Sequence, residues 1–171
     1  MIVLVMGITG SGKTTEGHLL AERLHWQFAD ADDFHSAANK EKMRQGIALT
    51  DADREPWLAA IRDQIWRWLA AKINGVITCS ALKQSYRDFL TSPPPGTGSN
   101  ADASQIKIVY LRGTYALIAE RLRSRHGHFA GESLLASQLA TLEEPHDALT
   151  IDIDQTPDQI VDEIIRRLNL A

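Results

Sequence analysis

Glycines, one lysine and two threonines near the start of the chain form a pattern that binds phosphate. Residues 7–14 read Gly-Ile-Thr-Gly-Ser-Gly-Lys-Thr and match G-x-x-x-x-G-K-[ST] at every fixed position. The glycines let backbone N–H groups turn inward around a phosphate, at the positive end of a helix dipole. Lys13 would reach the β- and γ-phosphates, and Thr14 would place its hydroxyl on Mg²⁺. The pattern predicts an ATP-type site made of Gly7, Ile8, Thr9, Gly10, Ser11, Gly12, Lys13, Thr14 and Thr15.

Three aspartates follow a short apolar run and supply carboxylates beside this loop. The segment reads Asp30-Ala31-Asp32-Asp33-Phe34-His35. Because alternate residues of an extended chain share a face, Asp30 and Asp32 should lie together and Asp33 should point away. In phosphoryl transfer, one such carboxylate holds Mg²⁺, and another orients the attacking hydroxyl or accepts its proton. The alternative is a polar turn that caps a helix. The nearby phosphate loop favours the functional role.

A first set of cations is spread over the expected strand ends of a chain whose net charge is −4. It consists of Lys42, Arg44, Arg54, Lys83 and Arg87. Lys83 and Arg87 are four residues apart on an expected helix, so their side chains point the same way. A guanidinium can grip a carboxylate with two hydrogen bonds. Each residue alone is more simply a solvated surface charge, but the set indicates an anion site.

A second set of cations lies in Arg121-Leu122-Arg123-Ser124-Arg125, which runs into His126-Gly127-His128-Phe129. Arg121 and Arg125 are one helical turn apart. Arginines that open a closing segment bring positive charge to a transferring phosphate and exclude water, which predicts a lid over about residues 123–140. Arginines near a helix C-terminus also complement its dipole, and this alternative stays open. No cysteine or further histidine lies near these two histidines in the sequence, so no metal site is expected there.

Short apolar runs alternate with helical patterns along the chain. This alternation predicts a parallel sheet covered on both faces, with ligands beyond the carboxyl ends of the strands. In the long helix the apolar stripe predicts core packing, whereas Trp66 lies off that face and is expected at a surface or a subunit contact. The expected strands are Ile2–Met6, Gln27–Asp30, Val76–Cys79, Ile106–Leu111 and Leu149–Ile153, and the expected helices span about 13–25, 56–73, 114–125, 132–143 and 157–169.

Length and composition indicate one ordinary globular domain over residues 1–171, with 44% hydrophobic and 23% charged residues. Residues 91–105 are rich in Pro, Gly and Ser and predict a mobile surface loop within this domain. An acidic chain without a basic stripe argues against a nucleic-acid partner. The chain shows no long apolar run and no leader pattern, which predicts a cytoplasmic protein without a membrane segment. The single cysteine, Cys79, excludes an internal disulfide and is expected to be buried.

Several blocks together resemble the gluconate kinase family, a group of small phosphate-loop enzymes related in fold to shikimate and nucleoside monophosphate kinases. The phosphate loop alone is generic, but the blocks Asp53–Trp57, Ser80–Lys83 and Gly127–Phe129 are specific to that family. Together the matching segments span about residues 1–145. The matching segments are Gly7–Thr14, Asp30–His35, Asn39, Lys42–Met43, Gly46–Leu58, Cys79–Asp88, Val109–Gly113, Arg121–Arg125, Gly127–Phe129 and Ser137–Gln138.

The resemblance implies an α/β fold of the P-loop NTPase type, nucleoside monophosphate kinase-like with a lid. It implies a five-stranded parallel sheet in the order 2-3-1-4-5 and commonly a homodimer. It also implies transfer of the γ-phosphoryl group of ATP to the 6-hydroxyl of D-gluconate, with Mg²⁺. Departures from the family pattern are Ser36 in place of proline, Ala130 in place of methionine, and the long 91–105 connection. These departures bear on lid packing and loop conformation.

The resemblance also assigns roles to residues of this chain. Lys13 and Thr14 serve phosphate and metal, Asp30 assists the metal, and Asp32 becomes the base or hydroxyl-orienting carboxylate. Arg121 and Arg125 belong to the lid. The binding site for the acceptor substrate consists of His35, Arg54, Lys83 and Arg87. Two alternatives remain: a kinase with another acceptor, such as shikimate or a nucleoside monophosphate, and a non-catalytic nucleotide-binding regulator. The presence of Lys13, Asp32 and the lid arginines favours an enzyme.

Overall fold

The apolar run at the N-terminus forms the central strand of the sheet, β1 (Ile2–Met6), which is buried along its whole length. β1 pairs in parallel with β3 (Gly75–Cys79) on one side and β4 (Ile106–Arg112) on the other. The edge strands are β2 (Gln27–Asp30) and β5 (Leu149–Asp152), also parallel. The predicted order β2-β3-β1-β4-β5 is therefore confirmed. This computed structural model describes residues 1–96, 102–126 and 130–170.

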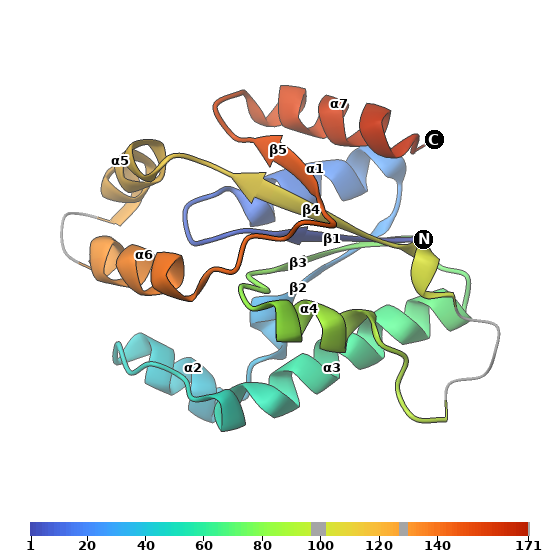
Figure 1. Ribbon diagram of the computed structural model, residues 1–171, viewed down its shortest axis with the longest axis horizontal. Helices are drawn as coiled ribbons and strands as arrows, with labels where there is room; N and C mark the ends of the chain where they lie inside the picture. Colours follow the sequence, from blue (N-terminus) through green and yellow to red (C-terminus); the bar gives the residue numbers. More distant parts are fainter. Residues whose placement is uncertain (97–101, 127–129, 171) are drawn as a thin grey trace.

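Helices cover both faces of the sheet, as parallel pairing requires. α1 (Lys13–Leu24) and α7 (Pro157–Leu168) lie on one face, and α3 (Asp51–Ala70) and α4 (Gln84–Thr91) lie on the other (Figure 1). Each layer closes its own apolar cluster against the strands. Cys79, at the end of β3, is buried in one of these clusters as predicted.

The remaining helices gather beyond the carboxyl ends of the strands (Figure 1). α2 (Ala37–Arg44) follows a short 3₁₀ helix, η1 (Ala31–Phe34), that leaves β2. α5 (Tyr115–His126) and α6 (Ala130–Thr141) connect β4 to β5. These elements therefore surround the edge of the sheet at which the phosphate loop leaves β1.

The start of α3 differs from the prediction, which placed a polar turn before Pro56 and a helix over 56–73. The helix begins at Asp51, because Thr50 and Asp53 form a capping box in which each side chain binds the other's backbone N–H. Pro56 therefore lies inside the helix, in its second turn, where it cannot supply the N–H that would otherwise donate to the Ala52 carbonyl. As a consequence, Asp51, Asp53 and Arg54 are held on a rigid helical turn.

The expected surface or subunit position of Trp66 is wrong. The side chain is only 3% exposed, and its indole N–H donates to the Leu90 carbonyl at 3.2 Å. α4 packs across α3 at this point and covers a residue that lies off the main apolar stripe. A helix covered by two neighbours buries more than one face, which a single periodicity does not reveal.

The loop predicted over residues 91–105 is shorter in the structure, because helical residues occupy both of its ends. Thr91 is the last residue of α4, and Ala103–Gln105 forms the 3₁₀ helix η2 that leads into β4. The middle of the predicted loop, residues 97–101, lies outside the described residues. Within the ranges that are described, no helix has the length and apolarity needed to cross a bilayer.

Candidate active site

The phosphate loop joins β1 to α1 and adopts a conformation that depends on its glycines. Gly10 and Gly12 have φ values of +78° and +96°, a region that other residues rarely adopt. A Cβ atom on Gly10 would lie 2.9 Å from Cγ of Leu122 on α5. Gly10 therefore allows α5 to pack directly on the loop, which brings the arginine-bearing helix to the predicted nucleotide site.

Lys13 lies at the start of α1 and is folded back across the loop. Its ammonium donates to the Ile8 carbonyl at 3.0 Å. Burial lowers the pKa of Lys13, and the negative charge of Asp32 opposes that shift. The lysine predicted to reach phosphate is thus held in place by a neutral backbone acceptor and faces a carboxylate across the site.

Thr14 and Asp30 are brought together as the metal prediction requires. The Thr14 hydroxyl donates to one carboxylate oxygen of Asp30 at 2.8 Å, and the other oxygen accepts the Asp32 N–H at 3.0 Å. Hydroxyl and carboxylate oxygens are ligands that suit Mg²⁺, which usually binds one or two protein groups together with substrate phosphates. The chemistry of these donors therefore fits Mg²⁺.

Asp32 lies beside this pair, but not for the predicted reason. The segment after β2 is the 3₁₀ helix η1 rather than an extended chain, and Asp30 caps its start. The Asp32 residue is exposed at its surface, although neighbouring protein shields part of its carboxylate from solvent. This partial burial raises the pKa of Asp32, and the charge of Asp30 adds to the shift. A carboxylate with a raised pKa is a stronger base than an ordinary aspartate.

His35 is fixed next to Asp32 by an aromatic contact. Its ring stacks on Trp57 with centroids 4.5 Å apart and planes 6° from parallel. Trp57 is itself held by a 2.7 Å hydrogen bond from its indole N–H to the Ala31 carbonyl. Burial lowers the pKa of His35, which favours the neutral imidazole, although the charge of Asp32 opposes the shift. Nδ1 of His35 is buried without a hydrogen-bond partner among the described residues.

Arg54 and Lys83 meet at one carboxylate. Asp51 accepts from the Lys83 ammonium at 3.1 Å and from the Tyr86 hydroxyl at 2.6 Å. The Arg54 guanidinium approaches the same carboxylate at 3.5 Å. These contacts join the start of α3 to the start of α4. They bring together two of the predicted acceptor-binding cations and hold the pKa of Asp51 below its usual range.

The other cations of the first set have local partners. Lys42 on α2 donates to the carboxylate of Asp53 at 2.8 Å. This hydrogen bond, together with those that Asp53 accepts from Thr50, lowers the pKa of Asp53 to about 2. Arg44 pairs with Glu41 on the exposed side of α2. Lys42 therefore ties α2 to α3, and Arg44 is a solvated surface charge.

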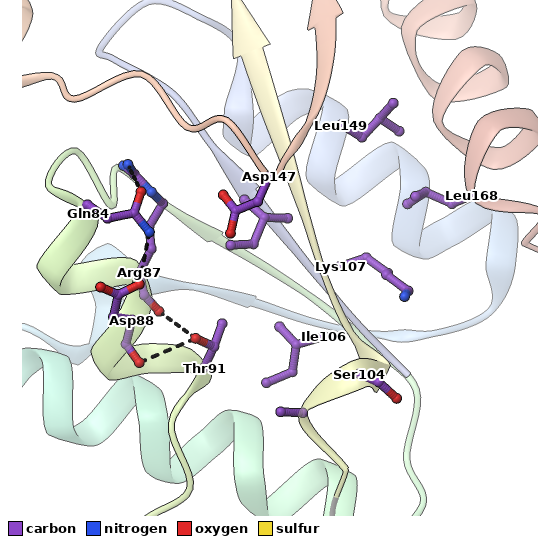
Figure 2. A pocket seen from close by; sticks show the side chains of 12 residues that line it. Gln84, Arg87, Asp88, Thr91, Ser104, Ile106, Lys107, Asp147, Leu149 and Leu168 are labelled. Atoms are coloured by element: carbon purple, nitrogen blue, oxygen red, sulfur yellow. Dashed lines mark hydrogen bonds between the residues drawn. The ribbon is translucent and has the colours of Figure 1, made fainter.

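The predicted acceptor role of Arg87 is not supported. The residue is 1% exposed, and its terminal nitrogens donate to four protein acceptors at 2.6–3.1 Å: the carbonyls of Ala81, Leu82 and Glu143 and the side chain of Gln84. Arg87 thus braces the turn after β3 against the segment that leads into β5. On its other side it borders a groove of about 480 Å³ over the first half of β4 (Figure 2), far along the sheet from the phosphate loop.

The two predicted lid arginines are placed differently. Arg121 donates to the Ile153 carbonyl at 2.8 Å, so its guanidinium is held at the carboxyl end of β5. The side chain of Arg125 and residues 127–129 lie outside the described part of the structure. Later in the predicted lid, Leu135 of α6 is fully buried against the main apolar cluster. This part of α6 is therefore packed on the site.

Gln138 is a residue at the site to which the sequence assigned no role. Its side-chain oxygen accepts the backbone N–H of Thr9 in the phosphate loop at 2.6 Å. Asp51 and Tyr86 likewise lie at the site although the sequence assigned them no role. The only signal for Gln138 in the sequence was its membership of a block that resembles the gluconate kinases, because nothing local connects it to a loop 129 positions earlier.

The proteins that this chain resembles are kinases, in agreement with the phosphate loop described above. A family model described as shikimate kinase matches residues 9–169, which places the chain in that broad family. A probable gluconokinase from Dictyostelium discoideum is 42% identical, covering 98% of this chain and 86% of the relative. A gluconokinase from Gluconobacter oxydans is 43% identical, covering 96% of this chain and 89% of the relative. The chain belongs to the gluconokinase family.

A solved structure supports this membership in three dimensions. The crystal structure of a gluconokinase from Sinorhizobium meliloti 1021 has a TM-score of 0.82 and 40% sequence identity, covering 98% of this chain and 90% of that one. The similarity to gluconokinases therefore extends over both the phosphate-loop half and the acceptor half of the fold.

Proposed function

We propose that this protein transfers the γ-phosphoryl group of ATP to the 6-hydroxyl of D-gluconate, giving 6-phospho-D-gluconate and ADP. The observation that carries the proposal is identity above 40% to gluconokinases along nearly the whole chain. The physical arrangement supports it, because a phosphate loop and a basic carboxylate lie next to a group of cations. A hydroxyl-rich acid requires those three features in one site.

On the donor side, the backbone N–H groups of the loop and the start of α1 bind the phosphates. Lys13 exchanges its contact with the Ile8 carbonyl for phosphate oxygens. Thr14 and Asp30 would hold Mg²⁺, which would neutralise negative charge on the phosphates. We assign Arg125, and with it the lid, to closure over the transferring phosphate.

On the acceptor side, Arg54 and Lys83 bind the gluconate carboxylate, and His35 contacts the hydroxyl groups. This orientation presents the 6-hydroxyl to Asp32. The hydroxyl oxygen forms a bond to the γ-phosphorus as the bond to the bridging oxygen of ADP breaks, and its proton passes to Asp32. Trp57 fixes the plane of the His35 ring, so the ring is held in one orientation beside Asp32.

We also propose that the protein is a cytoplasmic homodimer. The family resemblance supports the dimer, and the acidic chain with one buried cysteine suits a reducing compartment. Light scattering on purified protein measures the mass in solution, and a monomer across the working concentration range would contradict the dimer.

The acceptor is tested by ADP release with a panel of acids and nucleotides. Gluconate should give turnover, whereas shikimate and nucleoside monophosphates should give little, because the relatives that match this chain at 42–43% identity are gluconokinases. Turnover with shikimate or a nucleotide but not gluconate would overturn the assignment. Absence of turnover with every acceptor, together with ATP binding, would favour the regulator.

The pH profile tests the role of Asp32. Because burial and Asp30 raise its pKa above the ordinary 3.8, protonation and loss of kcat/KM should begin at a higher pH than for an ordinary aspartate. The measurement is kcat/KM for gluconate on the acid side, with circular dichroism at each pH to show that the protein stays folded. Asp33→Asn should move the acid side of the profile only slightly, and to lower pH, because the Asp33 charge raises the pKa of Asp32 less than burial and Asp30 do. A limb at or below pH 3.8 would exclude Asp32 as the titrating base.

A further inference from the structure

One peptide group of the phosphate loop is held from both sides. The carbonyl of the Ile8–Thr9 peptide accepts from the Lys13 ammonium, and its N–H donates to Gln138 of α6. The described backbone contains no cis peptide bond, so this C=O and N–H point in opposite directions. The carbonyl side of the peptide is therefore held by Lys13 and by the Ser11 N–H, which donates to the same carbonyl at 3.2 Å, and the N–H side is held by Gln138.

The contact from α6 is well defined. The Thr9 nitrogen can only donate, so the oxygen of the Gln138 carboxamide must face it. Leu135, one helical turn earlier on the same face of α6, is fully buried in a cluster that includes Ile8 and Leu122. α6 is thus fastened at two neighbouring points: by apolar burial against the loop and α5, and by a hydrogen bond to the loop backbone.

We propose that Gln138 is a positioning residue of the nucleotide site, which acts through the Ile8–Thr9 peptide. By holding the Thr9 N–H, it turns the Ile8 carbonyl into the cradle, where that carbonyl keeps the Lys13 ammonium in position until a phosphate takes over. Without this hold only the carbonyl end of the peptide is restrained, by Lys13 and by the Ser11 N–H, and the empty loop is less ordered before a nucleotide binds. Gln138 also couples α6 to the loop. The inference rests on the nucleotide half of the proposed function and does not depend on the acceptor.

The first test removes the hydrogen-bond acceptor of the Gln138 side chain while keeping the volume of that side chain. Gln138→Met should expose the Thr9 N–H to faster hydrogen exchange in the nucleotide-free protein. It should also weaken binding of both ADP and a non-hydrolysable ATP analogue by about tenfold, as expected for a partly buried donor left without a partner. The KM for ATP should rise correspondingly, whereas the KM for gluconate should change less than about twofold, a split that general damage to packing would not produce.

Two further variants complete the test. Gln138→Glu keeps an oxygen at the same place, so protection of the Thr9 amide in the nucleotide-free protein should be restored. Ser137→Ala, on the adjacent exposed position of α6, should leave exchange and nucleotide binding unchanged. Unchanged exchange of the Thr9 amide in Gln138→Met would overturn the proposal, as would faster exchange with unaltered nucleotide affinity. Calorimetry with ADP needs no acceptor, so a wrong choice of acceptor substrate would not affect this result.

Discussion

Asp32→Asn lowers turnover with gluconate by about 10²- to 10⁴-fold, the usual contribution of general base catalysis. The amide keeps the size of the side chain but cannot accept a proton from the 6-hydroxyl. ATP affinity should change by only a few-fold, because Lys13 and the loop amides bind the phosphates. The measurements are kcat from ADP release at saturating substrates and ATP affinity from calorimetry.

The control and the stability readout separate this role from damage to the site. Asp33→Asn changes the adjacent, exposed carboxylate and should leave kcat nearly unchanged. Since the pKa of Asp32 is raised in the folded protein, its ionised form costs stability above that pKa. Asp32→Asn should therefore keep or raise the midpoint of urea unfolding. Undiminished turnover with equal ATP binding would remove Asp32 from the mechanism.

Arg87→Met should lower the free energy of unfolding by about 3–5 kcal/mol, because several buried acceptors lose their donor at once, at about 1–3 kcal/mol each. The change leaves three carbonyls and the Gln84 side chain without their donor. It also loosens the turn after β3, where Ala81 has a positive φ of 43°. The measurement is urea denaturation followed by circular dichroism.

Activity distinguishes the structural role of Arg87 from the acceptor role that the sequence predicted. Per folded molecule, the KM for gluconate should stay within a few-fold of wild type, since the guanidinium is used by protein acceptors. Arg67→Met, on the exposed last turn of α3, should change stability by less than about 0.5 kcal/mol. A large rise in the KM for gluconate with normal stability would restore Arg87 to the acceptor site.

Features that depend on local sequence were predictable. Buried strands appear as apolar runs, and the phosphate loop needs its glycines and Lys13 at fixed spacing, so the sheet and the donor half followed from the chain. Asp30 and Asp32 were paired correctly although η1 is helical, because the Asp30 cap brings the two together as an extended chain would.

Features that depend on distant partners were not predictable from spacing. A guanidinium has the same chemistry for a substrate carboxylate and for a backbone carbonyl, so spacing does not reveal that Arg87 binds protein acceptors, among them the distant Glu143 carbonyl. Trp66 is buried because α4 crosses α3 above it. The bond from Thr9 to Gln138 spans most of the chain, and no local pattern indicates it.

The cluster at Asp51 has a consequence for selectivity. In the resting protein Lys83, Tyr86 and Arg54 are already satisfied by a carboxylate attached to the same chain. An arriving anion must compete with that tethered group, whose effective concentration far exceeds that of a free competitor. Simple anions such as phosphate or acetate gain too little from this exchange. A sugar acid gains more, because its hydroxyl groups add contacts along Asp32 and His35, so Asp51 would exclude the abundant small anions of a cell from the acceptor site.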